Sequence, residues 1–553
     1  MAGSLLLLLH AHLPWVRHPE HPDFLEEDWL YEAVAESYLP LLEVFDRLTA
    51  DRVGFRVTMT LTPTLLAMLQ DDLLMDRCAR RLARQEEFGD RESERTRHDP
   101  ALHALARFHR DFYAARLADF EARGRRLLPG LLRHADEGRL ELLTSAATHA
   151  FLPLLQDCPE AVKAQLAIGR EAHARALGRE PRGIWLPECG YVPGLEVDLA
   201  AEGLRSFFLE SHGLLWSSPP APGGVHLPAF TASGVAAFAR DPEASAEVWS
   251  SEVGYPGHPD YRELHRDVAF ELPWEDVAPW MIGTGVRRAM GYRYWRVTGG
   301  EREKARYEPR NARARAQAHA RHFVGRRREQ LARLVEEVGP GAVVVAPYDA
   351  ELFGHWWFEG PDFLEAVFRE LAALEDGPRA VTPSGYLESF SEQALVTPAA
   401  SSWGREGSAA TWLDPSNDWL YGKVNACAER LVARVACTPA PTPLQERALA
   451  QAGRELLLAQ SSDWAFILRA GTSAQYAEAR VSEHLEFFTA LLDGLDAGAM
   501  DLALLEAREA KVNLFPWLRS SAWAPAVAQG GSPPPPAPPP EAGGGPAPGG
   551  IFG

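Results

Sequence analysis

The 553-residue sequence contains few cysteines and no long apolar stretch. Its five cysteines are scattered and form no CxxC pair, which argues against both a disulfide framework and a structural zinc site. We therefore expect a protein of the reducing cytoplasm. No stretch approaches the roughly 18 apolar residues of a membrane span. The apolar run Leu5–Leu9 has neither the length nor the positive flank of a signal peptide.

The sequence also has fewer positively charged than negatively charged residues. The chain has 56 Lys and Arg residues against 76 Asp and Glu residues, a formal net charge of −20 at pH 7. Nucleic acids and anionic membranes attract basic surfaces, so we expect neither as a partner. An uncharged substrate is the best match for a chain of net negative charge. Hydrophobic residues make up 46% of the chain, a globular proportion that excludes a largely disordered protein.

The C-terminal end has a composition unlike the rest. Between Gly530 and Gly553 the chain has nine prolines and eight glycines, and Glu541 is the only charged residue there. Such a segment cannot bury enough apolar surface to offset the entropy that it would lose on ordering. We predict a disordered tail at residues 526–553.

The body of the chain alternates short apolar runs with longer amphipathic stretches, the pattern of parallel strands joined by helices. Six runs are predicted strands: Leu5–Leu9, Val57–Leu61, Leu140–Leu143, Ile184–Leu186, Phe207–Leu209 and Val343–Ala346. Three stretches between them are predicted helices: Ala101–Leu132, Glu160–Leu177 and Arg310–Val338. After Pro415 the strand pattern fades, and four amphipathic segments predict an all-helical C-terminal domain: Asn425–Val435, Leu444–Gln460, Thr472–Leu492 and Leu502–Val512.

Polar or aromatic residues follow each predicted strand directly. In a parallel barrel the active site lies at the carboxyl ends of the strands. A single polar strand ending would be weak evidence, but six of them indicate an active site at this end of the predicted barrel. The six endings are His10-Ala11-His12, Thr62-Pro63-Thr64, Thr144–His149, Pro187-Glu188-Cys189, Glu210-Ser211-His212 and Pro347–Glu351.

Glu188 and Asp349 are the candidate catalytic residues. Each follows a predicted buried strand, and Pro187 and Gly190 flank Glu188 in a way that fixes its backbone. Two such carboxyl groups facing one cavity can act as nucleophile and general acid in the cleavage of a glycosidic bond. An apolar surrounding would raise the pKa of one, so that it can donate a proton near neutral pH. The alternative is that Glu188 caps a helix and Asp349 begins a loop.

The His10-Ala11-His12 motif has three interpretations. Side chains two positions apart on a strand face the same way, so His10 and His12 could supply two ligands of a metal, with Asp349 or His149 as a third. Metal-dependent deacetylases and mannosidases would fit this pattern. The two histidines could instead donate hydrogen bonds to sugar hydroxyl groups, or they could be satisfied core residues.

Aromatic side chains form a third group of candidates. Exposed aromatic faces suit sugar rings, whose C–H faces are apolar and whose rims form hydrogen bonds. The alternative is that single tryptophans belong to the core. Cys189 has no histidine in its motif, so we interpret it as a packing residue rather than a nucleophile. The candidates are Trp274, Trp403, Trp412, Trp419 and Trp464 in loop-like contexts, and Tyr348, His355, Trp356 and Trp357 beside Asp349.

Together these motifs resemble glycoside hydrolase family 57, and within it the 1,4-α-glucan branching enzymes. The resemblance covers about Leu5 to Val512. Its most specific parts are Trp185–Tyr191, similar to the segment with the nucleophilic glutamate, and Pro347–Trp357, similar to the segment with the acid/base aspartate. Weaker parts are His10–Pro14, which resembles the HxHxP region, Leu140–Leu155, similar to the second region, and Asn417–Trp419 and Ser461–Trp464, similar to the C-terminal domain.

The resemblance implies an α/β fold, a (β/α)7 barrel at residues 1–400 with an inserted subdomain around residues 190–270. A helical C-terminal domain, residues 401–525, would close over the cleft. Glu188 would be the nucleophile and Asp349 the acid/base residue. Members of the family use no metal, so no cofactor is expected and sugar binding is favoured for His10 and His12. The other expected sugar-binding residues are His149, Arg262, Trp274, Tyr348, His355, Trp403, Trp412 and Asp463.

The sequence is therefore identified as a retaining α-glucan enzyme, which we expect to cleave α-1,4 links and form α-1,6 branches in amylose or glycogen. An α-amylase or 4-α-glucanotransferase could use the same residues, and an inactive glucan-binding protein is an alternative of another class. One departure favours hydrolysis. Branching enzymes of this group typically carry a mobile loop with a tyrosine at its tip, but the corresponding segment Gly213–Gly234 has no tyrosine. The sequence does not fix the oligomeric state, and a monomer is the simpler expectation.

Overall fold

The structure is a computed structural model that describes residues 3–250, 253–281, 285–298 and 304–525. The tail predicted at residues 526–553 lies outside the described residues. Within them the strands form two sheets, one with the order β3-β2-β1-β8 and β9 beside β1, the other with the order β4-β5-β7-β6. The strands are β1 (Ser4–Ala11), β2 (Val57–Leu61), β3 (Leu140–Leu143), β4 (Gly183–Ile184), β5 (Ser206–Leu209), β6 (Ala229–Phe230), β7 (Ala236–Ala239), β8 (Val343–Asp349) and β9 (Arg379–Ala380).

The two sheets are joined at both ends. Thr144 and Ile184 form a parallel bridge between the end of β3 and β4. The backbone N–H of Asp241, just after β7, donates a hydrogen bond of 2.8 Å to the carbonyl oxygen of Val345 on β8. Apart from the short β6, which pairs antiparallel with β7, all strand pairs are parallel. Seven parallel strands thus follow one another round a ring, β1-β2-β3-β4-β5-β7-β8, as the predicted barrel requires.

The leucine run of β1 shows why the strand can be apolar on both faces. Leu6 and Leu8 pack with Val343 and Val345 in one buried cluster, inside the ring. Leu5, Leu7 and Leu9 belong to a second cluster, which includes the surrounding helices. Successive side chains of a strand point to opposite faces, and helices cover the outer face of a parallel sheet, so neither face meets water.

Each of the six predicted strands overlaps an observed strand, although β4 shares only Ile184 with the predicted Ile184–Leu186, and one barrel strand was not predicted. The missed strand β7 reads Ala-Ala-Phe-Ala, without a β-branched residue, although all four side chains are buried. Alanine has low β-propensity, so the run carries little strand signal until its neighbours are known. Strands β5 and β7 both lie within residues 190–270, the range predicted for the insertion.

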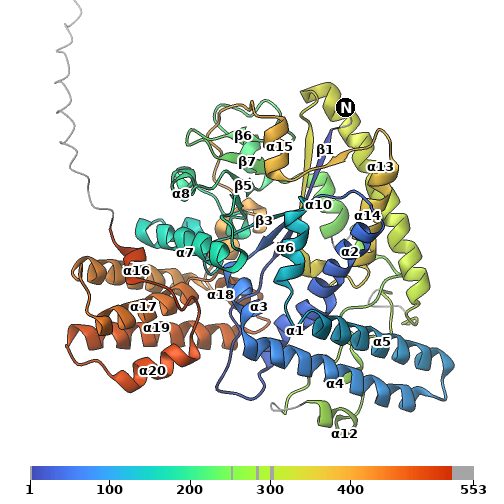
Figure 1. The fold of residues 1–553 in the computed structure, drawn as a ribbon, viewed down its shortest axis with the longest axis horizontal. Coiled ribbons are helices and arrows are strands. Elements are labelled where there is room, and N and C mark those ends of the chain that lie inside the picture. The colour runs from blue at the N-terminus through green and yellow to red at the C-terminus, as the bar shows by residue number, and fades with distance from the viewer. Residues whose placement is uncertain (1–2, 251–252, 282–284, 299–303, 526–553) are drawn as a thin grey trace, which may run out of the picture.

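Helices surround the ring (Figure 1), and all three predicted helical stretches are among them. The predicted helix Ala101–Leu132 is two helices, because the chain turns at Gly124 and Arg125, which both have positive φ. The helices of this part are α1 (Asp28–Ala33), α2 (Leu39–Ala50), α3 (Pro63–Gln70), α4 (Asp72–Thr96), α5 (Pro100–Ala122), α6 (Leu128–Asp136), α7 (Pro159–Leu177), α8 (Leu195–Ala201), α9 (Ser211–Leu215), α10 (Pro242–Trp249), α11 (Val268–Glu271), α12 (Trp274–Val277), α13 (Pro309–Val338), α14 (Gly360–Ala373) and α15 (Pro383–Ser389).

The C-terminal part is helical, as predicted, and lies beside the barrel at the lower left of Figure 1. Its central helix is α17, in which every residue from Ala448 to Ala459 is buried, because α16, α19 and α20 pack around it. The helices are α16 (Asp418–Ala436), α17 (Pro443–Ala459), α18 (Ser462–Ala470), α19 (Ala474–Asp496) and α20 (Leu502–Lys511).

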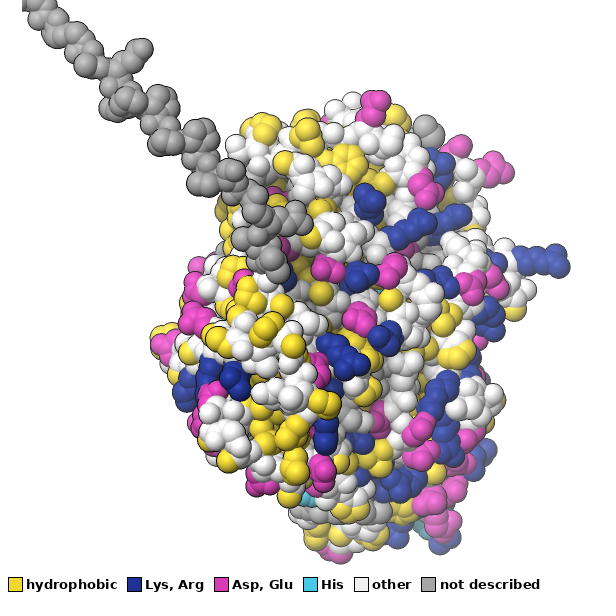
Figure 2. All heavy atoms as spheres, turned by 60° about the vertical axis from the view of Figure 1, so that its left-hand side comes forward, with side chains coloured by type: hydrophobic (Ala, Val, Ile, Leu, Met, Phe, Trp, Pro, Cys, Tyr) yellow, Lys and Arg dark blue, Asp and Glu magenta, His cyan; other side chains and the backbone are white. Residues whose placement is uncertain are grey.

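Acidic and basic side chains are interspersed over the face shown in Figure 2 rather than gathered into a patch of one sign. In the part of the chain that the structure describes, no helix combines the length and apolarity that crossing a bilayer requires. All five cysteines are free.

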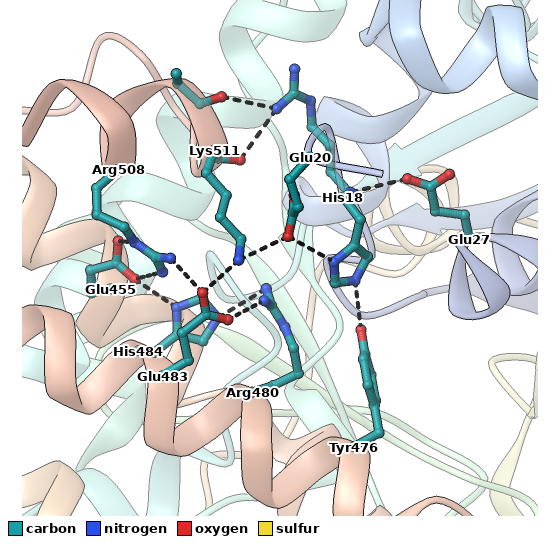
Figure 3. A network of polar contacts seen from close by, with 12 residues as sticks. His18, Glu20, Glu27, Glu455, Tyr476, Arg480, Glu483, His484, Arg508 and Lys511 are labelled. Atoms are coloured by element: carbon teal, nitrogen blue, oxygen red, sulfur yellow. Dashed lines mark hydrogen bonds and ion pairs between the residues drawn. The ribbon is translucent and has the colours of Figure 1, made fainter. Parts of the chain in front are cut away.

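A polar network joins the helical domain to the loop after β1 (Figure 3). The ring of His18 and the hydroxyl of Tyr476 lie 3.1 Å apart. Lys511 bridges the two parts of the protein, with its Nζ 2.8 Å from a carboxylate oxygen of Glu20 and 2.6 Å from one of Glu483. Because these groups come from distant parts of the sequence, they fix how the helical domain sits against the barrel.

The buried centre of this network is Glu455. Its carboxylate accepts hydrogen bonds from Arg508 at 2.7 and 2.9 Å and lies 2.7 Å from Nδ1 of His484. Burial alone would raise the pKa of Glu455, but these two partners lower it to about 2. The carboxylate is fully buried. The interior of the helical domain therefore depends on a charge that is stable only with its partners.

We predict that Glu455→Gln lowers the free energy of unfolding by about 3 kcal/mol at pH 7, because it leaves buried positive charge without its partner. A carboxyl group with a depressed pKa stabilises the fold above its unfolded pKa of about 4.3, and this contribution is lost as the pH falls toward 2. The difference between variant and parent should therefore shrink at pH 3. Denaturant unfolding at both pH values measures it.

The matched control is Arg447→Ala, which breaks the partly exposed ion pair with Glu509 in the same domain. Exposed pairs contribute up to about 1 kcal/mol, so this variant should change stability little. Equal losses in the two variants would contradict a special role for the buried charge.

Candidate active site

Glu188 stands in a strained turn directly after β4. Both Glu188 (φ 60°) and Cys189 (φ 51°) adopt left-handed backbone conformations, which cost of order 1–3 kcal/mol each for residues other than glycine. Surrounding contacts hold the turn: the backbone N–H of Trp403 donates a hydrogen bond of 3.0 Å to the backbone carbonyl oxygen of Glu188. A side chain at Gly190 would meet the ring of Phe151 at 2.6 Å, so the motif needs glycine there.

Two donors from outside the barrel hold the carboxylate of Glu188. The indole N–H of Trp403 donates at 2.6 Å to one oxygen, and the hydroxyl of Ser462 donates at 3.0 Å to the other. Burial raises the pKa of Glu188 above its ordinary value, while these hydrogen bonds and the charge of His12 oppose the rise. Only 15% of the side chain is exposed. The two hydrogen bonds thus orient both carboxylate oxygens and leave the negative charge of Glu188 in place.

Asp349 ends β8 and is paired in register with His10 of β1. Burial raises the pKa of Asp349 well above its ordinary value, and the negative charges of Glu351 and Glu188 raise it further. Within the described chain no hydrogen bond to its carboxylate offsets this, and only the charge of Arg240 opposes it. The surroundings therefore favour a protonated Asp349.

Three histidines form a stack beside Glu188. The rings of His12 and His149 are stacked with centroids 3.7 Å apart, and Nε2 of His10 lies 3.0 Å from Nε2 of His149. Nδ1 of His149 lies 3.0 Å from the hydroxyl of Ser462, which contacts Glu188. Burial, followed by the charge of His12, lowers the pKa of His10 and of His149 well below the ordinary value. These two rings are neutral.

His12 carries the charge of the stack. Its Nε2 lies 3.0 and 3.1 Å from the two carboxylate oxygens of Asp463, at the start of α18. Burial would lower the pKa of His12, but Asp463 raises it above the ordinary value. Burial would likewise raise the pKa of Asp463, and His12 lowers it instead. The result is an ion pair between the barrel and the helical domain.

The arrangement suits acid/base chemistry with two carboxyl groups of different character. Glu188 accepts two hydrogen bonds that stabilise its ionised form, whereas Asp349 lies in surroundings that favour its protonated form. A nucleophile and a general acid need this difference. The neutral histidines and the His12–Asp463 pair offer further hydrogen-bonding groups to a polar, uncharged substrate.

Comparisons with known proteins cover nearly the whole chain. The family model described as "Glycosyl hydrolase family 57" matches residues 6–398. The model described as "1,4-alpha-glucan branching enzyme, C-terminal" matches residues 423–523. The chain belongs to glycosyl hydrolase family 57. The resemblance inferred from the motifs is thereby confirmed.

Relatives within family 57 include enzymes with two different names. A 1,4-alpha-glucan branching enzyme of Thermococcus kodakarensis is 34% identical, over 93% of this chain and 78% of its own. The structure of a branching enzyme from Pyrococcus horikoshii has a TM-score of 0.86 and 33% identity, covering 95% of this chain and 98% of that one. The alpha-amylase AmyC from Thermotoga maritima has a TM-score of 0.89 and 40% identity, covering 95% of this chain and all of the other.

Among the predicted aromatic residues, Trp403 contacts one of the two carboxyl groups, through its hydrogen bond to Glu188. Trp412 is buried and stacks on Phe151 with ring centroids 4.4 Å apart. Tyr348 is buried, and its hydroxyl donates to the carbonyl oxygen of Ala244 at 2.8 Å. Trp274 is 40% exposed at the start of α12. The structure gives no contact between these three side chains and Glu188 or Asp349, so their sugar-binding roles stay predictions.

Arg262 and His355, also predicted to bind sugar, meet at the buried carboxylate of Glu36. Nη2 of Arg262 lies 3.5 Å from it and Nδ1 of His355 lies 3.1 Å from it. Arg262 is 4% exposed, and its guanidinium lies over the ring of Phe358 at 3.9 Å. His355 keeps 20% of its side chain exposed. His355 can therefore still contact a ligand, whereas Arg262 acts here within a charged cluster of the core.

Sequence reasoning missed four groups that contact the site. Ser462 lies within the quoted motif Ser461–Trp464, and Glu351 lies within Pro347–Trp357, so the motifs contained a signal for both. Thr62, at the end of β2, lies 3.1 Å from Nδ1 of His12. Arg240, which opposes the rise in the pKa of Asp349, directly follows β7, the strand that the sequence did not reveal.

The histidine stack also bears on the metal alternative. One ligand atom each of His12, His149 and Asp463 lies within 4.8 Å of the others, close enough to share a cation. Yet Nε2 of His12 lies 3.0 and 3.1 Å from the two carboxylate oxygens of Asp463, hydrogen-bond distances that a proton at this nitrogen accounts for. A proton and a metal at this nitrogen exclude each other.

We predict that treatment with EDTA leaves activity on amylose unchanged, because the ion pair of His12 and Asp463 takes the place of a metal site. Elemental analysis of the purified protein provides the second measurement. Stoichiometric zinc, together with loss of activity when it is removed, would contradict this and favour the metal-dependent alternatives.

We predict that Trp403→Phe moves the acidic limb of the pH–activity profile upward by about one pH unit. Removing the indole N–H takes away a hydrogen bond to an ionised group, a contribution of about 1.5–3 kcal/mol, so the pKa of Glu188 rises and the nucleophile is protonated at higher pH. The control Trp412→Phe changes an indole with no contact to Glu188 and should leave that limb in place. A common shift in both variants would argue against the hydrogen bond as the cause.

Proposed function

We propose that this protein is a retaining 1,4-α-glucan branching enzyme. It cleaves an α-1,4 link in a glucan chain and transfers the released segment to a 6-hydroxyl group of an acceptor chain. Family membership, the match to the branching-enzyme C-terminal model and the relatives of that name support this assignment. The substrate is a glycogen-like or amylose polymer, and no cofactor takes part.

The reaction is a double displacement in which Glu188 and Asp349 act on opposite faces of the sugar ring. A carboxylate oxygen of Glu188 attacks the anomeric carbon while Asp349 transfers its proton to the leaving glycosidic oxygen, which breaks the C–O bond. Asp349, now ionised, takes the proton of the acceptor 6-hydroxyl, whose oxygen attacks the anomeric carbon and displaces Glu188. Two inversions give net retention. Asp349 regains its proton and Glu188 its charge.

The observation that carries the proposal is the hydrogen bond from Ser462 to Glu188. It brings the helical C-terminal domain into contact with the proposed nucleophile, and the same helix supplies Asp463 to His12. Transfer requires that the acceptor hydroxyl reach a high effective concentration next to the glycosyl-enzyme, in competition with water at about 55 M. A second domain at the carboxylate gives the acceptor a surface to bind.

Hydrolysis by the same residues is the second candidate. The relative from Thermotoga maritima is named an alpha-amylase and has 40% identity to this chain, and Gly213–Gly234 contains no tyrosine. That segment does carry Trp216, directly after α9, with 73% of its side chain exposed. An exposed indole in this loop can contact a sugar chain, so the loop presents an exposed aromatic group although it has no tyrosine. We expect branching with measurable hydrolysis.

Location and assembly belong to the proposal as well. The scattered cysteines, all free in the structure, support a cytoplasmic enzyme of glycogen-type carbohydrate metabolism. A monomer is our working assumption.

The test is product analysis on amylose. Branch points are counted from the new chain ends that a debranching enzyme releases, and hydrolysis is counted from reducing ends before debranching. We predict both products, with branches in excess. Glu188→Gln should reduce both by at least about 10³-fold, because without the nucleophile there is no covalent intermediate.

Asp349→Asn should be comparably inactive on amylose, yet retain activity on aryl glucosides whose leaving group needs no protonation. Trp403→Ala should reduce transfer more than hydrolysis, since it leaves both carboxyl groups in place. If amylose yields only new reducing ends, the branching assignment is wrong and the amylase alternative holds. Glu188→Gln with more than about a thousandth of the parent's activity would refute the proposed nucleophile.

A further inference from the structure

A cavity of about 350 Å³ lies between the barrel and the C-terminal end of the described chain. Its walls are α3, α7 and the segment Asn513–Trp517, which follows α20. Neither Glu188 nor Asp349 lines it. Its volume is at the lower end of the range of about 300–1,000 Å³ found for ligand sites, enough for a short stretch of a small polar chain.

The cavity combines aromatic faces with polar side chains. Trp15, Phe515 and Trp517 contribute the aromatic surface. The guanidinium of Arg175 lies over the ring of Trp517, 4.8 Å from its centroid, and holds that indole in place. Asn513 adds an amide. Flat apolar faces edged by hydrogen-bonding groups are the surface that a sugar ring matches.

Two polar atoms in the lining lack partners. The indole N–H of Trp15 and the side-chain oxygen of Asn513 are buried, and neither forms a hydrogen bond within the described chain. A buried polar group without a partner is costly, and such groups in native proteins usually have a water or a ligand to bind. One atom is a donor and the other an acceptor. A hydroxyl group can accept a hydrogen bond from the indole N–H and can donate one to the amide oxygen.

The charges near the cavity are already paired. Asp71 accepts a hydrogen bond from Nε of Arg17 at 2.8 Å, and Arg175 lies 2.7 Å from a carboxylate oxygen of Glu171. The charged side chains in the lining therefore already have partners of opposite charge, and an ionic ligand is not needed to balance them. An uncharged ligand with many hydroxyl groups fits this balance, whereas a phosphate or a peptide with net charge does not.

We propose that this cavity is a second glucan-binding site, which holds a segment of an α-1,4-glucan away from the catalytic carboxyl groups. The inference rests on the proposed function, because the polymer that the enzyme processes is the ligand. Trp15 lies on the loop after β1, three residues beyond His12, so the cavity shares this loop with the candidate active site. A polymer held there dissociates less readily between successive reactions.

The first experiment counts binding sites in the full chain with Glu188→Gln, which binds glucan without turning it over. Titration calorimetry with maltoheptaose should show two sites per chain. Adding Ala176→Phe, which places a ring in the cavity, should leave one. Asn513→Ala provides a milder second variant, and thermal unfolding verifies that both variants are folded.

The second experiment uses the active enzyme. Trp517→Ala should raise the half-saturating concentration of amylose by about three- to tenfold, the value of one aromatic contact, while turnover of maltoheptaose stays unchanged. Phe270→Ala removes another exposed aromatic ring, far along the chain in α11, and should change neither. Normal amylose saturation in Trp517→Ala would overturn the inference.

The outcomes separate this inference from the proposed function. One site that Ala176→Phe does not affect overturns the second site and leaves the branching proposal intact. Two sites in the parent and one in the filled variant support the inference. Absence of any maltoheptaose binding, together with inactivity on amylose, refutes both.

Discussion

The structure depends on how the carboxylate of Glu188 is satisfied. A buried carboxylate is costly unless hydrogen bonds stabilise it, and the barrel strand that carries Glu188 supplies none to its two oxygens. The donors are Trp403, 215 residues further along the chain, and Ser462, 274 residues further. The two hydrogen bonds to the carboxylate of Glu188 therefore exist only when these later segments pack against the barrel.

The same constraint explains the histidine stack. His149 contacts Ser462, and His12 contacts Asp463, so each ring lies between the barrel and α18. Two neutral rings and one charged ring share a small space, which is tolerable because the single positive charge is paired with Asp463. The network around Glu455 and Lys511 supports the docking from further away, as it fixes the neighbouring helices of the domain.

The docked domain also explains how one set of carboxyl groups can serve both hydrolysis and transfer. In the proposed mechanism the chemistry at Glu188 and Asp349 is the same up to the glycosyl-enzyme, and the product then depends on whether water or a sugar hydroxyl attacks it. The segment with Trp403 and α18 contact the site, and we expect changes in them to shift the balance between water and a sugar acceptor without altering the two carboxyl groups. Relatives named as branching enzymes and as an alpha-amylase can therefore share this fold closely.

The sequence alone determined the features that depend only on residues close together along the chain. Apolar runs with polar endings gave six of the seven barrel strands and the positions of Glu188, Asp349, His10 and His12. The motifs identified the family, because long runs of specific residues around reactive groups rarely match by chance. In the C-terminal domain amphipathic periodicity, which depends only on neighbours along the chain, located α17, α19, α20 and the later part of α16, but not the start of α16 or the helix α18.

Tertiary structure decided what depends on distant residues. β7 is a strand because its neighbours bury it, although Ala-Ala-Phe-Ala has little tendency to extend, and Arg240 at its end was hidden with it. Trp412 and Arg262 occupy the types of position that suggest sugar binding, yet packing on Phe151 and pairing with Glu36 place them in the interior. Periodicity and motifs report on neighbours in sequence, whereas burial and the pKa of a carboxyl group are set by whatever the folded chain brings within a few ångströms.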